Sequence, residues 1–201
     1  MRTPVIGFDL DLTLIDSRPG IAATLRELSA RTGVYIDADA AVTRLGPPLE
    51  HELLRWFDPA EVPAAGDIFR ELYPMHAVHS SPALPGVAEA FAAVEERGGA
   101  IVVITGKYEP NARLHLDHLG LRTDAVVGWA WGEGKTEALR SHGARVYVGD
   151  HPHDMTSARQ ADVVAVGVLT GHHDAASLTA AGADVVLTDL RDFPAWLVDR
   201  D

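Results

Sequence analysis

From residue 82 onward, short apolar runs alternate with stretches in which apolar residues recur at helical spacing. The clearest run is AIVVIT at 100–105, and the stretch at 86–97 places Val87, Phe91 and Val94 on one helical face. Strands that are apolar throughout are typical of a parallel sheet that helices cover on both sides. We therefore predict an α/β fold with a Rossmann-like parallel sheet. Its strands are expected at 4–8, 100–105, 125–128, 145–149, 162–169 and 184–187.

The stretch at 17–81 has a different character. It contains no strand-like run, and its apolar residues recur at helical spacing between breaks such as Gly46-Pro47-Pro48. We predict that 17–81 form a small all-helical cap inserted after the first strand, and that 1–16 and 82–201 form the core. In open α/β sheets, ligands bind outside the carboxyl ends of the strands. The residues that follow the strands are therefore the first candidates for a functional site.

Composition narrows the possible functions. The 201 residues include 17 basic and 29 acidic ones, a formal net charge of −12, which argues against nucleic acid as a partner. There is no cysteine, so disulfides and thiolate catalysis are excluded. No apolar run is long enough to span a membrane, and the first residues lack the pattern of a signal peptide. We expect a cytoplasmic protein with no membrane partner, and leave its oligomeric state open.

Two acids, Asp9 and Asp11, follow directly after the apolar run at 4–8. In an extended chain alternate side chains point the same way, so both carboxylates are expected on one side. Like charges at the end of a buried strand need a bound cation or a role in acid–base chemistry. The alternative is a turn in which both carboxylates bond to backbone groups. The spacing alone leaves both interpretations open.

Further polar residues stand at strand ends and helix starts. Thr105 ends the apolar run at 100–105, and Gly106 after it allows a close approach of a ligand. Lys135 lies at a predicted helix start, Asp150 follows the run at 145–149, and Asp154 comes four residues later. Taken singly, each could be a strand-end cap, a solvated lysine or a helix N-terminal charge.

In order, these residues resemble the four motifs of the haloacid dehalogenase superfamily of phosphohydrolases. Asp-x-Asp-x-Thr at 9–13 resembles the first motif, and Thr105 resembles the second. Lys135 resembles the third motif, and Gly-Asp-x-x-x-Asp at 149–154 resembles the fourth. The resemblance covers essentially the whole chain. Family members that have a small helical cap carry this cap between the first and second motifs. Further resemblance, to the phosphoglycolate-phosphatase-like branch, lies at 85–87, 105–107 and 182–184.

The resemblance implies a Mg²⁺-dependent phosphatase that hydrolyses a small phosphorylated metabolite, such as phosphoglycolate, through an aspartyl-phosphate on Asp9. Asp11 would protonate the leaving oxygen and then activate water. Thr105 and Lys135 would hold the phosphoryl oxygens. The implied Mg²⁺ site comprises Asp9, Asp11 through its carbonyl group, Asp150, and Asp154, which would orient metal-bound water or Lys135.

An acid at position 11 separates branches of the superfamily, because dehalogenases and phosphonate hydrolases lack it. Asp11 therefore favours phosphate esters as substrates. The residues expected to bind substrate are Thr13, Gly106, Lys107 and Arg44. Arg44 precedes the stiff turn Gly46-Pro47-Pro48 and could bind an anionic or hydroxyl-bearing leaving group, or be a solvated helix-end arginine. Only two of the 17 basic residues are lysines, Lys107 and Lys135, which suggests that a compact ammonium is needed there.

Some features depart from the family pattern. Leu12 stands where the family usually has glycine, so this turn is expected to be strained or altered, with a possible loss of activity. His151 and His153 could recruit a second, transition metal or face the surface. The pair His115 and His118 shows no sign of a site. A phosphomutase on the same core and a non-catalytic binding or regulatory protein remain alternatives, and the physiological substrate is left open.

Overall fold

The computed structural model describes residues 4–198, in which six parallel strands form one sheet in the order β3-β2-β1-β4-β5-β6. The predicted parallel α/β sheet is confirmed, and every predicted strand is present to within two residues at each end. β1 lies at the centre, where the strand order reverses, and this is where open α/β sheets form a ligand crevice. The strands are β1 (Val5–Phe8), β2 (Ala100–Ile104), β3 (Ala125–Val127), β4 (Ala144–Gly149), β5 (Val164–Val168) and β6 (Val185–Leu187).

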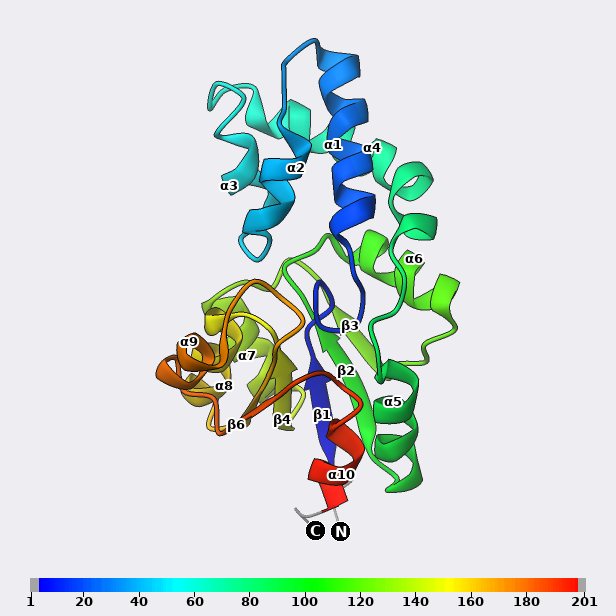
Figure 1. Cartoon of the computed structure of the whole chain (residues 1–201), viewed down its shortest axis with the longest axis vertical. Coiled ribbons are helices and arrows are strands. Elements are labelled where there is room, and N and C mark those ends of the chain that lie inside the picture. Colours follow the sequence, from blue (N-terminus) through cyan, green and yellow to red (C-terminus); the bar gives the residue numbers. More distant parts are fainter. Residues whose placement is uncertain (1–3, 199–201) are drawn as a thin grey trace.

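Helices cover both faces of the sheet (Figure 1). Alternate strand residues point to opposite faces, so Phe8 and Val103 pack under one group of helices and Tyr147 under the other. The first group is α5 (Val87–Glu96), α6 (Glu109–Leu119) and α10 (Phe193–Val198). The second group is α7 (Glu133–Ser141), α8 (Pro152–Gln160) and α9 (Ala175–Ala180).

The helices from α1 to α4, here called the helical insert, follow β1 in the chain and lie beyond the carboxyl ends of the strands (Figure 1). They surround a hydrophobic cluster of their own, in which Leu25 and Leu28 of the first helix meet Phe69 and Tyr73 of the last. The domain boundaries at 17 and 82 stay a prediction. The helices are α1 (Arg18–Thr32), α2 (Ala38–Ala41), α3 (Leu49–Leu53) and α4 (Val62–His76), with 3-10 turns at Val42–Arg44 and Val78–Ser80.

The chain enters and leaves the helical insert along two neighbouring segments. The amide of Leu84 donates to the carbonyl of Leu14 at 2.9 Å, and that of Asp16 to the carbonyl of Pro82 at 2.9 Å. These bonds hold the entering and the leaving segment together at the base of the insert. Within residues 4–198, none of the helices combines the length and the apolar character that crossing a membrane requires.

Candidate active site

The predicted site residues come together at the carboxyl edge of the sheet. Asp9, Thr105 and Asp150 each follow the last residue of a neighbouring strand, β1, β2 and β4. Lys135 lies in the first turn of α7, and Asp154 in the first turn of α8. All five are buried. Parallel strands end at the same edge, so the fold itself brings these residues together although they are far apart in sequence.

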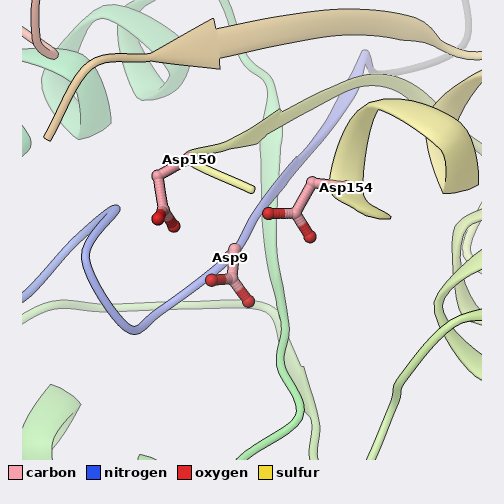
Figure 2. Close-up of side chains that lie close together, drawn as sticks. All are labelled: Asp9, Asp150 and Asp154. Carbon is pink, nitrogen blue, oxygen red and sulfur yellow. The ribbon is translucent and has the colours of Figure 1, made fainter. Parts of the chain in front are cut away.

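A buried ion cluster lies at the centre of this edge. The Lys135 ammonium is 2.8 Å from Asp9 Oδ1 and 2.5 Å from Asp154 Oδ1. Asp9, Asp150 and Asp154 each offer a carboxylate oxygen within 4.8 Å of the others, and their side chains point toward a common space (Figure 2). Among the described residues, no other group of three or more acidic or histidine side chains is placed so that all of them could bind one ion.

The charges of this cluster do not balance. Three carboxylates and one ammonium give a formal charge of −2, and burial makes each uncompensated charge costly. Burial, opposed by Lys135, raises the pKa of Asp9 to about 7. Burial and the charges of Asp154 and Asp9 raise the pKa of Asp150 well above its usual range. A divalent cation with a preference for oxygen ligands fits this site, because it would offset the remaining charge.

Two glycines make room for the carboxylates. A Cβ atom at Gly149 would overlap the side chain of Asp154, and one at Gly171 would overlap that of Asp150. The hydroxyl of Thr13 donates to Asp150 Oδ1 at 3.1 Å. Thr13, which was expected to bind substrate, therefore lies against a potential metal ligand and does not line the cavity described below.

Asp11 is not part of the group formed by the three carboxylates of the ion cluster, and its partner is Lys107. Its Oδ1 is 2.9 Å from the ammonium of Lys107, whose side chain is 7% exposed. Burial would raise the pKa of Asp11, but the charge of Lys107 lowers it below its usual range. The pKa of Asp9 is raised and that of Asp11 is lowered, so the two acids lie in different electrostatic environments. That Asp11 offers its carbonyl to a metal stays a prediction.

The turn after β1 keeps a backbone conformation that glycine favours. Leu12 has φ = 59°, in the left-handed region, and its amide donates to the carbonyl of Ile15 at 2.8 Å. A side chain in this region costs roughly 1–3 kcal/mol. Two outcomes are expected for this position, a strained backbone or an altered turn, and the structure shows the strained backbone. The Leu12 side chain is buried and lines the cavity beside Asp9 and Asp11.

A cavity of about 180 Å³ lies between the carboxyl edge of the sheet and the helical insert. Gly106 and Lys107 line it from the core, as does Thr105. Arg44 lines it from the insert, but its guanidinium already binds Glu52 through two hydrogen bonds of 3.1 and 2.6 Å. Arg44, whose side chain is 34% exposed, is thus ion-paired at the wall of the cavity, and its role in binding substrate stays a prediction.

Two residues of α4 that no sequence motif indicates also line the cavity. Arg70 binds Glu50, and its guanidinium lies 5.5 Å from the ring centre of Trp129. Tyr73 lies one turn further along and bonds to Lys107. Helical spacing places Arg70 and Tyr73 close on one surface of α4, but no local pattern indicates that this surface faces the site.

The histidines of the fourth motif pack together. The rings of His151 and His153 are nearly parallel, at 4° and 5.3 Å between centres, and both contact Trp131. His151 Nδ1 accepts from the amide of His153 at 3.1 Å, and burial lowers the pKa of His151 to about 4. The His151 ring therefore caps the start of α8 through Nδ1. Within the described chain, these histidines do not join a group of three potential metal ligands.

Comparison with known proteins identifies the family. The model of the haloacid dehalogenase-like hydrolases matches residues 6–168. A protein named probable phosphatase IndB, from Dickeya dadantii, is 31% identical over 92% of this chain and 89% of its own. A phosphoglycolate phosphatase of Mesorhizobium japonicum is 30% identical over 87% and 86%. The solved structure of a predicted phosphatase from Clostridium acetobutylicum, 22% identical, covers 99% of this chain and 100% of its own with a TM-score of 0.83, which shows a shared fold. Because the family model spans β1 to β5 and includes every residue of the ion cluster, the chain belongs to the haloacid dehalogenase-like hydrolases.

Proposed function

We propose that the protein is a Mg²⁺-dependent phosphatase that acts on a small phosphomonoester, phosphoglycolate or a similar metabolite, through an aspartyl-phosphate intermediate. The observation that carries this proposal is the buried cluster of Asp9, Asp150, Asp154 and Lys135, with Asp11 in a separate environment beside it. Membership of the family and the phosphatase names of its relatives support the reaction class.

The residues that would hold Mg²⁺ are Asp9 and Asp150, with Asp154 beside them and the carbonyl of Asp11 as a further oxygen. Their hard oxygen ligands and the formal charge of −2 suit this ion. When bound, the ion would neutralise charge on the phosphoryl group and polarise its oxygens.

Side chains of the protein carry out the remaining steps of the proposed reaction. A carboxylate oxygen of Asp9 attacks phosphorus in line, forming an O–P bond as the bond between phosphorus and the leaving oxygen breaks. Lys135 and Thr105 hold the phosphoryl oxygens. An arriving phosphate raises the pKa of Asp11 by charge repulsion, which lets Asp11 carry the proton that the leaving oxygen takes. Asp11 then accepts a proton from the water that hydrolyses the intermediate, restoring Asp9.

Metal dependence and substrate class are tested together. We expect phosphate release from a panel of small phosphomonoesters to stop in excess chelator and to return with Mg²⁺, because the cluster lacks two positive charges. A calorimetric or fluorescence melting curve should also show a higher Tm with Mg²⁺, since a ligand that binds the folded state stabilises it. Full activity in chelator would contradict the role of the cluster. Conversion of a sugar phosphate without phosphate release would favour a phosphomutase, and chloride release from a haloacid a dehalogenase.

The acid–base role of Asp11 predicts a dependence on the leaving group. Asp11→Asn should slow the release of an aliphatic alcohol by roughly a hundred- to ten-thousand-fold. Release of 4-nitrophenolate should change far less, because this group needs little protonation. Asp16→Asn is a matched control, since Asp16 lies in the same segment but binds Arg18. Equal losses on both substrates would point to a structural or metal-orienting role for Asp11.

We further propose that the helical insert selects the leaving group, because the core supplies the residues expected to contact the phosphoryl group. A substrate-binding role for Arg44 would require it to share or exchange Glu52. The cytoplasmic location and the lack of a nucleic-acid partner stay predictions from composition.

A further inference from the structure

A continuous set of buried polar contacts links the helical insert to Asp11. Tyr73, on α4, lies with its hydroxyl 2.7 Å from the ammonium of Lys107, and this ammonium is 2.9 Å from Asp11 Oδ1. On its other side the Tyr73 hydroxyl is 2.9 Å from Nε2 of His115, on α6. Tyr73 and His115 are 1% and 0% exposed, so water does not replace these contacts. Of these four residues, only Tyr73 belongs to the insert.

The Lys107 ammonium sets the direction of its hydrogen bond with Tyr73. The Lys107 ammonium can only donate, so the Tyr73 oxygen accepts from it, while the tautomer of His115 sets whether Nε2 accepts from or donates to the Tyr73 hydroxyl. His115 can accept because it is neutral: burial and the charge of Lys107 lower its pKa to about 4. The Tyr73 hydroxyl is therefore held from the core side by His115. Its lone pair is directed at Lys107.

Lys107 is held at both ends. Its amide donates to Thr105 Oγ1 at 3.2 Å, which ties its backbone to the residue that follows β2. Its ammonium is placed by Tyr73 and Asp11 together. If α4 moved away from α6, the ammonium would lose one of these two partners, and the Asp11 carboxylate would be held by a more mobile side chain.

We propose that Tyr73 and Lys107 are positioning residues for Asp11, and that contact between the helical insert and the core completes this arrangement. The inference rests on the proposed phosphatase function, in which Asp11 acts on the leaving oxygen. Tyr73 and Lys107 hold the carboxylate at the angle from which it reaches that oxygen. A displacement of about 1 Å in such a group can cost about a hundred-fold in rate.

The test is a Tyr73→Phe variant, which keeps the ring in its hydrophobic cluster and removes only the hydroxyl. For an alkyl phosphate we expect kcat to fall by about ten- to a hundred-fold with little change in KM. Turnover of 4-nitrophenyl phosphate should stay within about two-fold, because its leaving group needs little protonation. Tyr35→Phe is the matched control, since Tyr35 lies in the insert with its side chain 75% exposed.

Lys107→Met removes the ammonium itself and should approach the loss caused by Asp11→Asn on the alkyl phosphate. The decisive measurement is a double-mutant cycle: in an Asp11→Asn background, Tyr73→Phe should cause no further loss. Additive losses, equal losses on both substrates, or a change in KM alone would overturn the positioning role. A wild-type protein that releases phosphate from neither substrate would overturn the phosphatase proposal and this inference with it. Tyr73→Phe leaves no buried charge unpaired, so the double-mutant cycle can be measured even if Lys107→Met does not fold.

Discussion

Replacement of Asp9 by asparagine is expected to abolish phosphate release, with a fall in kcat of roughly ten-thousand- to a million-fold. The amide is nearly isosteric with the carboxylate but cannot form the bond to phosphorus. It also removes one of the oxygen anions of the cluster. The measurement is phosphate release at saturating substrate and Mg²⁺, in steady state and in a single turnover. Because the proposed intermediate forms on Asp9, the variant should release no leaving group in the single-turnover experiment.

The fold of the Asp9→Asn variant should be intact. Lys135 keeps its contact with Asp154 at 2.5 Å, and the variant carries one buried negative charge fewer than the wild type. Circular dichroism and a melting curve check this, with Asp16→Asn as a control for an acid-to-amide change in the same segment. A folded Asp9→Asn protein with wild-type rates would remove Asp9 as nucleophile, whereas an unfolded one would indicate that the carboxylate is needed chiefly for the charge balance of the cluster.

The sequence was sufficient to predict the core of the site because strand ends can be recognised in it. Apolar runs end at Phe8, Ile104 and Gly149, and each is followed by a polar residue that the sheet has no reason to bury. Once the strands are parallel, these ends must meet at one edge. The convergence of Asp9, Thr105 and Asp150 therefore follows from local patterns and one general rule of topology.

The contacts made by the helical insert could not be predicted in the same way. Helical spacing shows which residues share a face, but not which other helix or loop that face meets. Tyr73 and Lys107 are 34 residues apart, and their contact depends on how α4 lies against the core. No local pattern marks His115, because its contact with Tyr73 depends on how α4 and α6 pack together. The pairing of Arg44 with Glu52 likewise depends on the turn between them.

At Leu12 the backbone conformation and the burial of the side chain have opposite effects on stability, as the sequence indicates. The left-handed backbone at φ = 59° opposes the local preference of leucine, while burial of its side chain favours the folded state. Full burial of a leucine is worth roughly 1.5–3 kcal/mol, similar to the cost of the strained backbone. The two terms nearly cancel, so the turn can retain its shape without glycine. The side chain then takes up space in the cavity that a glycine would leave open.

Lys135→Met should destabilise the protein as well as inactivate it, which separates this residue from a group that acts only on substrate. Lys135 is 2% exposed and, in the part of the chain that the structure describes, its ammonium is the one cationic group bonded to the cluster. Burial would lower its pKa, but the charges of Asp154 and Asp9 raise it well above its usual range. Methionine would fill a similar volume and leave three carboxylates without a counter-charge.

In chelator, the free energy of unfolding of Lys135→Met should fall by about 3–5 kcal/mol, the usual cost of removing one partner from a buried ion pair. Urea unfolding measures this change, with Arg145→Met as a control for loss of an exposed cation. Adding Mg²⁺ should recover part of the loss, and recover more in the variant than in the wild type, because the ion would replace a missing positive charge at the same carboxylates. Phosphate release should remain strongly reduced even at saturating Mg²⁺, since the ion restores charge but not the ammonium that holds the phosphoryl oxygens. An unfolding free energy equal to that of the wild type in chelator would mean that the carboxylates already balance their charge by protonation, and Lys135 would then be needed for catalysis alone.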